Sequence, residues 1–156
     1  MGIEIERKFL VLTSAWEDQA RSSKVIKQGY LSAAKERTLR VRRSGESAFL
    51  TIKGPPEGLS RLEFEYQIPL DDAETMLARL LESSLIEKTR FLVPFDNQVW
   101  EVDRFEGANA GLVLAEIELE REDDEISLPP WIGEEVSDDG RYSNAYLSIH
   151  PFGEWK

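Results

Sequence analysis

The chain has 156 residues and a formal net charge of −11, with 41% hydrophobic and 31% charged residues. This composition is typical of a folded protein, and the length predicts one domain over residues 1–156. So acidic a surface argues against a nucleic-acid backbone as partner. The absence of cysteine excludes thiol catalysis, zinc–thiolate sites and disulfides, and it fits a reducing compartment.

No membrane partner is expected, because the longest apolar stretch, near Gly111 to Ala115, is far too short to span a bilayer. The chain reaches Glu4 and Glu6 at once, so no signal peptide is expected either. Together these features predict a cytoplasmic protein.

Most of the chain is predicted to form strands, separated by turn-like segments such as Ser44-Gly45 and Asp96-Asn97. Eight strands with mostly short connections predict an antiparallel meander. In chain order the predicted strands are 3–12, 24–33, 37–44, 47–54, 60–69, 86–95, 98–105 and 112–121.

One segment, 71–84, has a helical period, because its apolar residues fall on one face. Asp71 or Asp72 is a suitable residue to cap its N-terminus. Shorter helices are expected around 14–20 and 142–148. The fold class is therefore mainly β, with helices packed on the outside of the sheet.

Charged residues recur at i and i+2 in strand after strand, while the opposite faces are apolar. Residues at i and i+2 lie on the same side of a strand, roughly 7 Å apart. The ionic faces carry Glu4, Glu6 and Lys8 on the first strand, Arg40 and Arg42 on the third, Thr51 and Lys53 on the fourth, Glu63 and Glu65 on the fifth, Lys88 and Arg90 on the sixth, Glu101 and Asp103 on the seventh, and Glu116, Glu118 and Glu120 on the eighth.

For any single strand, a solvated outer face is the simpler interpretation. The same pattern in seven strands favours a different interpretation. The apolar stripe of helix 71–84 must cover an apolar surface. If it covers the outside of a closed eight-stranded barrel, the ionic faces point inward. Dry, unpaired charge would be costly there. A wet tunnel that holds a polyanion and divalent metal ions is consistent with both the clustered cations and the clustered carboxylates.

The ordered series of motifs resembles the CYTH superfamily, the triphosphate tunnel metalloenzymes. Glu4-Ile5-Glu6-Arg7-Lys8 matches its N-terminal E-x-E-x-K signature, the charged pairs named above follow in the family's order, and Tyr142-Ser143-Asn144 is similar to its C-terminal Y-x-N element. The match covers nearly the whole chain, so residues 1–156 are expected to be a single CYTH domain. The resemblance implies an eight-stranded antiparallel β-barrel tunnel that acts on triphosphates with Mg²⁺ or Mn²⁺. The small bacterial members of the tripolyphosphatase type are the most similar.

Roles for the tunnel residues follow from this resemblance. Phosphate oxygens are assigned to Lys8, Arg40, Arg42, Lys53, Lys88 and Arg90, and the metal to Glu4, Glu6, Glu116 and Glu118, with Asp103 a further ligand. Glu63, Glu65 and Glu101 would hold the cations in place or orient water. By analogy with small family members, Lys88 and Tyr30 are the candidates for the general base. The alternatives are that Lys88 is only a phosphate clamp and that Tyr30 only packs.

The leading function is hydrolysis of inorganic tripolyphosphate to pyrophosphate and phosphate. A class IV adenylyl cyclase and a thiamine or nucleoside triphosphatase are the enzymatic alternatives. A polyphosphate- or nucleotide-binding module without turnover is the alternative of another class. A homodimer is compatible with the sequence, although no residue demonstrates one.

Overall fold

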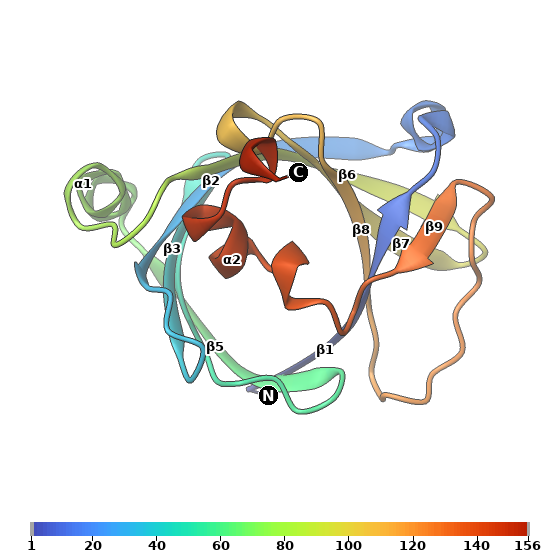
Figure 1. Ribbon diagram of the computed structural model, residues 1–156, viewed down its shortest axis with the longest axis horizontal. Coiled ribbons are helices and arrows are strands. Elements are labelled where there is room, and N and C mark those ends of the chain that lie inside the picture. The colour runs from blue at the N-terminus through green and yellow to red at the C-terminus, as the bar shows by residue number, and fades with distance from the viewer. Residues whose placement is uncertain (1, 156) are drawn as a thin grey trace.

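Eight strands close into an antiparallel barrel in the computed structural model, which describes residues 2–155 (Figure 1). The predicted strands are all present, with ends that differ from the expected ones by at most three residues. The strands are β1 (Ile3–Val11), β2 (Ser22–Ser32), β3 (Thr38–Ser44), β4 (Ser47–Lys53), β5 (Ser60–Ile68), β6 (Ile86–Phe95), β7 (Gln98–Phe105), β8 (Val113–Glu118) and a short β9 (Ile132–Glu135) that the sequence did not indicate.

The strand order differs from the predicted meander, although every pairing is antiparallel. Around the barrel the order is β1, β5, β4, β3, β2, β6, β7, β8 and back to β1. The meander is therefore broken twice, because β2 does not pair with β1, and β6 pairs with β2 instead of β5. The meander prediction was wrong at these two steps because ring closure depends on which distant strand edges meet, and local turn residues do not specify that.

The barrel closes at a short seam between β1 and β5, where the register joins three residue pairs, Ile3↔Leu62, Glu4↔Arg61 and Ile5↔Ser60. Farther along β1, the same edge pairs with β9 through a register shift between Phe9 and Val11. β8 pairs with the other edge of β1 over residues 6–10. Both edges of β1 are therefore used, and β1 is the strand that closes the ring.

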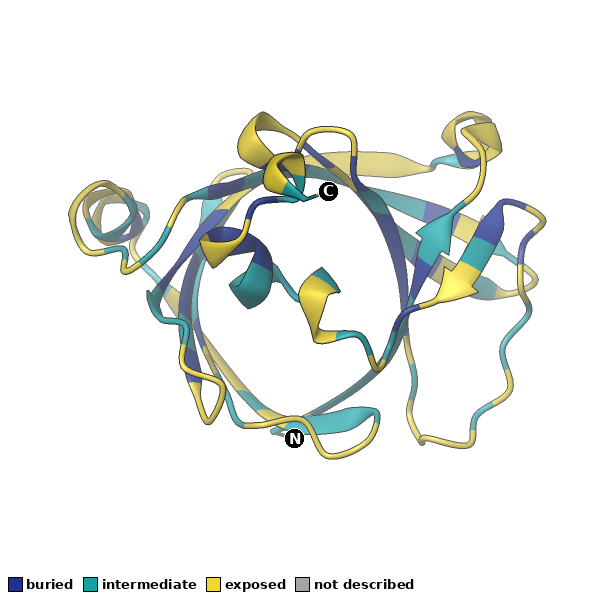
Figure 2. Cartoon of the chain, in the orientation of Figure 1, coloured by how far each residue is buried: buried dark blue, intermediate teal, exposed yellow. Residues whose placement is uncertain are grey.

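The outside of the barrel carries the hydrophobic core, as the inward-facing charges require. Around β1, β7 and β8 a cluster of buried residues includes Phe9, Trp100 and Trp131, whose rings meet edge to face. The 3₁₀ turn η1 (Ala15–Gln19), inside the predicted 14–20 segment, adds the buried Trp16 to this cluster. Figure 2 shows buried residues along this wall of the barrel.

Helix α1 (Leu70–Arg79) packs on the opposite outer wall, where Ala73 is buried against Val41 and Ala48. The helix starts after Pro69, so Asp71 and Asp72 lie in its first turn and neither caps it. Its acidic first turn suits the positive end of the helix dipole. No helix in residues 2–155 has the length and apolar character needed to cross a membrane.

The C-terminal segment enters one end of the barrel instead of packing outside it (Figure 1). It consists of the turn η3 (Gly140–Tyr142), helix α2 (Asn144–Ile149) and the turn η4 (Phe152–Glu154), while η2 (Gly107–Asn109) joins β7 to β8. Leu147 of α2 is fully buried against Ile86, Phe105 and Leu114. Since these strand residues share the inward face with the charged pairs, the barrel interior is apolar at this end and ionic beyond it.

Candidate active site

A cavity of about 770 Å³ occupies the ionic part of the barrel. The predicted site residues converge on it from all eight strands of the barrel. Those that line it are Glu4, Glu6, Lys8, Tyr30, Arg40, Arg42, Lys53, Glu63, Glu65, Lys88, Arg90, Glu101, Glu116 and Glu118. Asp103 does not line the cavity; it is 1% exposed and lies behind the basic residues.

Antiparallel register places several opposite charges directly across from one another, although it also pairs Glu6 with Glu118 and Glu101 with Glu116. Lys8 faces Glu116 between β1 and β8, and the two groups lie 3.6 Å apart. Lys53 faces Glu63 between β4 and β5 at 3.4 Å. Period-two alternation therefore points the charges inward, and the register between strands determines which of them meet.

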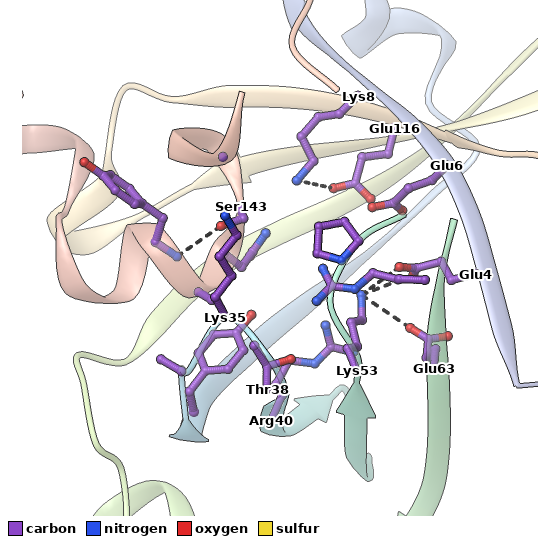
Figure 3. A pocket seen from close by; sticks show the side chains of 18 of the residues that line it. Glu4, Glu6, Lys8, Lys35, Thr38, Arg40, Lys53, Glu63, Glu116 and Ser143 are labelled. Atoms are coloured by element: carbon purple, nitrogen blue, oxygen red, sulfur yellow. Dashed lines mark hydrogen bonds and ion pairs between the residues drawn. The ribbon is translucent and has the colours of Figure 1, made fainter. Parts of the chain in front are cut away.

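The wall formed by β1 and β8 is the most acidic part of the cavity (Figure 3). Glu4 accepts two contacts from Lys53, at 3.0 and 3.2 Å, which lower its pKa despite its burial. Although burial opposes it, Lys8 and Arg90 hold the pKa of Glu116 at about 2. Glu6 differs from both, because burial and the neighbouring Glu116 and Glu4 raise its pKa well above the usual range. This carboxyl lies where added positive charge would be favourable.

The opposite wall is basic, and not every cation on it has a carboxylate partner among the described residues. Arg40 is 6% exposed, and its Nε atom is buried without a hydrogen-bond partner among the described residues. Its Nη2 reaches the Thr51 hydroxyl at 3.3 Å and Glu65 at 3.7 Å. Burial, Arg40 and Arg90 together lower the pKa of Arg42. Buried guanidinium groups of this kind are suited to bidentate contacts with phosphate.

Lys88 lies deepest, 1% exposed, between the basic wall and helix α2. Its Nζ donates to Asp103 Oδ2 at 2.7 Å, and Asp103 also accepts from Arg90 Nε at 2.7 Å and Nη2 at 2.9 Å. Burial, Arg90 and Arg42 lower the pKa of Lys88 to about 7, although Asp103 opposes the shift. Tyr30 is 4% exposed and lines the same cavity.

The acidic wall fits a hard divalent cation, although the side chains do not form a closed cage. Among residues 2–155 no three acidic or histidine side chains are grouped tightly enough to hold an ion by themselves. Mg²⁺ usually takes one or two carboxylates and completes its shell with waters and substrate phosphate oxygens. Glu6, whose pKa is raised by burial and by the adjacent carboxylates, is the clearest candidate ligand, with Glu4, Glu116 and Glu118 also lining the cavity.

Several cavity residues escaped the sequence analysis. Lys35 lies in the β2–β3 loop, where no alternation marks it, and it is among the cavity-lining side chains drawn in Figure 3. Arg61 precedes the Glu63 pair on the same face of β5, so the period-two pattern could have found it. Tyr146 of α2 and His150, which directly follows the helix, contribute to the lining, with ring centroids 4.6 Å apart.

The comparisons with known proteins agree with this architecture. The family model described as the CYTH domain matches residues 2–144. The chain is 44% identical to an inorganic triphosphatase of Acetivibrio thermocellus over 100% of this chain and 99% of that protein. It is 41% identical to an inorganic triphosphatase of Nitrosomonas europaea over 94% and 97% of the two chains. It also resembles the crystal structure of the inorganic triphosphatase NE1496, with a TM-score of 0.69, 36% identity and 94% of each chain covered.

Proposed function

The chain belongs to the CYTH family, and from this premise we propose that it is a metal-dependent hydrolase that cleaves inorganic tripolyphosphate to pyrophosphate and phosphate. The relatives named above, at 41–44% identity, are inorganic triphosphatases, which supports this substrate class. The observation that carries the proposal is a barrel cavity with a basic wall whose buried Arg40 Nε has no hydrogen-bond partner in residues 2–155, opposite an acidic wall that includes Glu6.

The basic wall would bind the phosphate chain. Arg40, Arg42 and Arg90 are guanidinium groups held at different positions around the cavity, so they can contact more than one phosphate group. Lys8, Lys53 and Lys88 complete the set of cations. Lys8 and Lys53 lie at the border with the acidic wall, already paired with Glu116 and Glu4. Phosphoanhydride hydrolysis depends mainly on such positioning and charge neutralisation.

Glu4, Glu6, Glu116 and Glu118 would hold Mg²⁺ or Mn²⁺ on the acidic wall. A bound divalent ion neutralises charge on phosphate oxygens and makes a coordinated water more acidic. Asp103 is better suited to another role than the metal ligation suggested by its sequence motif. Both its oxygens already accept hydrogen bonds from Lys88 and Arg90, so it would orient these two cations.

Lys88 is the side chain best suited to accept a proton from the attacking water. A lysine with a pKa of about 7 is substantially neutral near physiological pH, so its Nζ can act as a base. Water attack on the terminal phosphorus breaks the bridging P–O bond, pyrophosphate leaves, and the water proton passes to Nζ. Tyr30 would contact the substrate from the same cavity. Glu63, Glu65 and Glu101 would keep Lys53, Arg40 and Arg90 in place.

A substrate panel tests the proposal. Tripolyphosphate, ATP, thiamine triphosphate and pyrophosphate are each incubated with the protein and Mg²⁺, Mn²⁺ or a chelator, and phosphate and cyclic AMP are measured. We expect metal-dependent phosphate release that is fastest from tripolyphosphate. Cyclic AMP and pyrophosphate from ATP would instead identify a cyclase. Tight binding without any product would identify a binding module.

Two further expectations from the sequence remain predictions, a homodimer and a cytoplasmic location. The homodimer is tested by the mass of the protein in solution. The location is tested by fractionation of the source cells.

A further inference from the structure

Asn144 of helix α2 belongs to a chain of polar side chains that runs along the inner wall of the neighbouring strands β3, β2 and β6. Asn144, the first residue of α2, accepts a hydrogen bond at Oδ1 from Lys88 Nζ at 3.0 Å. The same Oδ1 accepts from Gln28 Nε2 at 2.8 Å, and Gln28 Oε1 accepts from Arg42 Nε at 2.7 Å. The C-terminal helix therefore contacts two cations of the basic wall, Lys88 directly and Arg42 through Gln28.

The Asn144 oxygen is one of two acceptors that fix the Lys88 ammonium group. The other is Asp103 Oδ2 at 2.7 Å, so two of the three ammonium hydrogens are directed by side chains. Lys88 is 1% exposed, so these two side chains, and not solvent, set the direction of its hydrogens in the structure. Gln28 is fully buried and holds the Asn144 oxygen in turn. The amide supplies this second acceptor without adding a negative charge to the basic wall.

The far end of α2 is attached independently of Asn144. Ser83 donates its hydroxyl to Ser148 Oγ at 2.8 Å, and the Ser84 backbone N–H donates to the Ser148 carbonyl at 3.0 Å. Leu147 is also fully buried in the apolar end of the barrel. Neither Ser83 nor Ser148 lines the cavity. Loss of the Asn144 amide therefore leaves the helix anchored, and Ser83 offers a way to loosen the helix without touching Lys88.

We propose that Asn144 is a positioning residue, whose side-chain oxygen, presented by helix α2, fixes the Lys88 amino group toward the phosphate chain. The inference rests on the proposed function for its effect on turnover. The geometry itself, an amide oxygen shared by Lys88 and Gln28, does not depend on which triphosphate is cleaved. Helix α2 thereby serves both to fill the barrel end and to orient a residue of the reaction site.

Steady-state kinetics on tripolyphosphate compare Asn144→Ala with Ser83→Ala as a matched control. We expect Asn144→Ala to lower kcat by about tenfold or more with KM within about twofold, since small displacements of a reacting group reduce turnover strongly. Ser83→Ala should keep kcat within about twofold. Equal losses of kcat in both variants, or an unchanged kcat in Asn144→Ala, would overturn the proposal.

A spectroscopic measurement separates this role from a purely structural one. In ¹⁵N-lysine-labelled protein at about pH 6, the buried, hydrogen-bonded Lys88 ammonium should give a slowly exchanging ¹H–¹⁵N signal, assigned by its absence in Lys88→Arg. The signal should persist in Ser83→Ala and in Asn144→Asp, which keeps an acceptor, and broaden or vanish in Asn144→Ala. A signal unchanged in Asn144→Ala would overturn the inference. Absence of turnover by the wild type would overturn the proposed function alone, because this measurement needs no substrate.

Discussion

Replacement of Asp103 by Asn is the substitution whose effect follows most directly from the structure. Asp103 is buried and receives three hydrogen bonds, one from Lys88 and two from Arg90. Although burial opposes it, Arg90 and Lys88 lower its pKa far below the usual range, so the carboxylate is charged at neutral pH. Asp103→Asn removes that charge and leaves the buried Lys88 and the half-buried Arg90 facing each other with Arg42 nearby.

Breaking a buried ion pair by removing one partner costs about 3–5 kcal/mol. In a chain of this length each kcal/mol shifts Tm by about 2–4 °C, so a drop of about 10 °C is expected in thermal unfolding without metal. Tripolyphosphate should raise the Tm of Asp103→Asn more than that of the wild type, because the polyanion supplies the missing charge. The control is Glu135→Gln, which removes a partner of Arg7 on the barrel exterior and should cost at most about 1 kcal/mol. A loss in Asp103→Asn no larger than in Glu135→Gln would refute the assignment of Asp103 to the cations.

Three further predictions concern the two walls of the cavity. In a chelator, Glu6→Gln should raise the unfolding free energy by about 0.5–2 kcal/mol, because a Glu6 pKa that is higher in the folded than in the unfolded state means that its charge opposes folding at neutral pH. The same substitution should abolish metal-dependent turnover. A lower unfolding free energy of Glu6→Gln in the chelator would contradict this. Between pH of about 7 and 10, Lys88 keeps its proton in the unfolded chain but has lost it in the folded protein. The unfolding free energy of the wild type should therefore rise with pH relative to that of Lys88→Met. The same pH dependence of the unfolding free energy in both proteins would count against the lowered pKa. Lys35→Ala should raise KM for tripolyphosphate several-fold with kcat nearly unchanged, because Lys35 lines the cavity from a loop; a loss confined to kcat would be inconsistent with that role.

The barrel could be predicted because strand alternation is a strict geometric rule. Once Glu4, Glu6 and Lys8 occupy one strand at period two, they must share a face, and the same holds for Lys88 and Arg90. The apolar partners on the other face then determine which side meets the core. The strand β9 could not be found in this way. It has only four residues after Pro129-Pro130 and is defined by pairing with the distant β1.

The site was less predictable where contacts depend on ring closure and on the C-terminal segment. Glu4 and Lys53 come from strands separated by β5, so no register pair places them together, yet their groups meet at 3.0 Å across the cavity. Gln28 gave no signal because its side chain is neutral and so did not belong to the charged series. Asn144 was recognised only as part of a motif, and its contact with Lys88 depends on α2 entering the barrel.

Phosphorus NMR of tripolyphosphate during incubation with the protein tests the central claim most directly. The account predicts that, with Mg²⁺ or Mn²⁺, the tripolyphosphate signals are replaced by pyrophosphate and orthophosphate in equal amounts, and that a chelator stops the reaction. Unchanged tripolyphosphate in the presence of folded protein and either metal would contradict it.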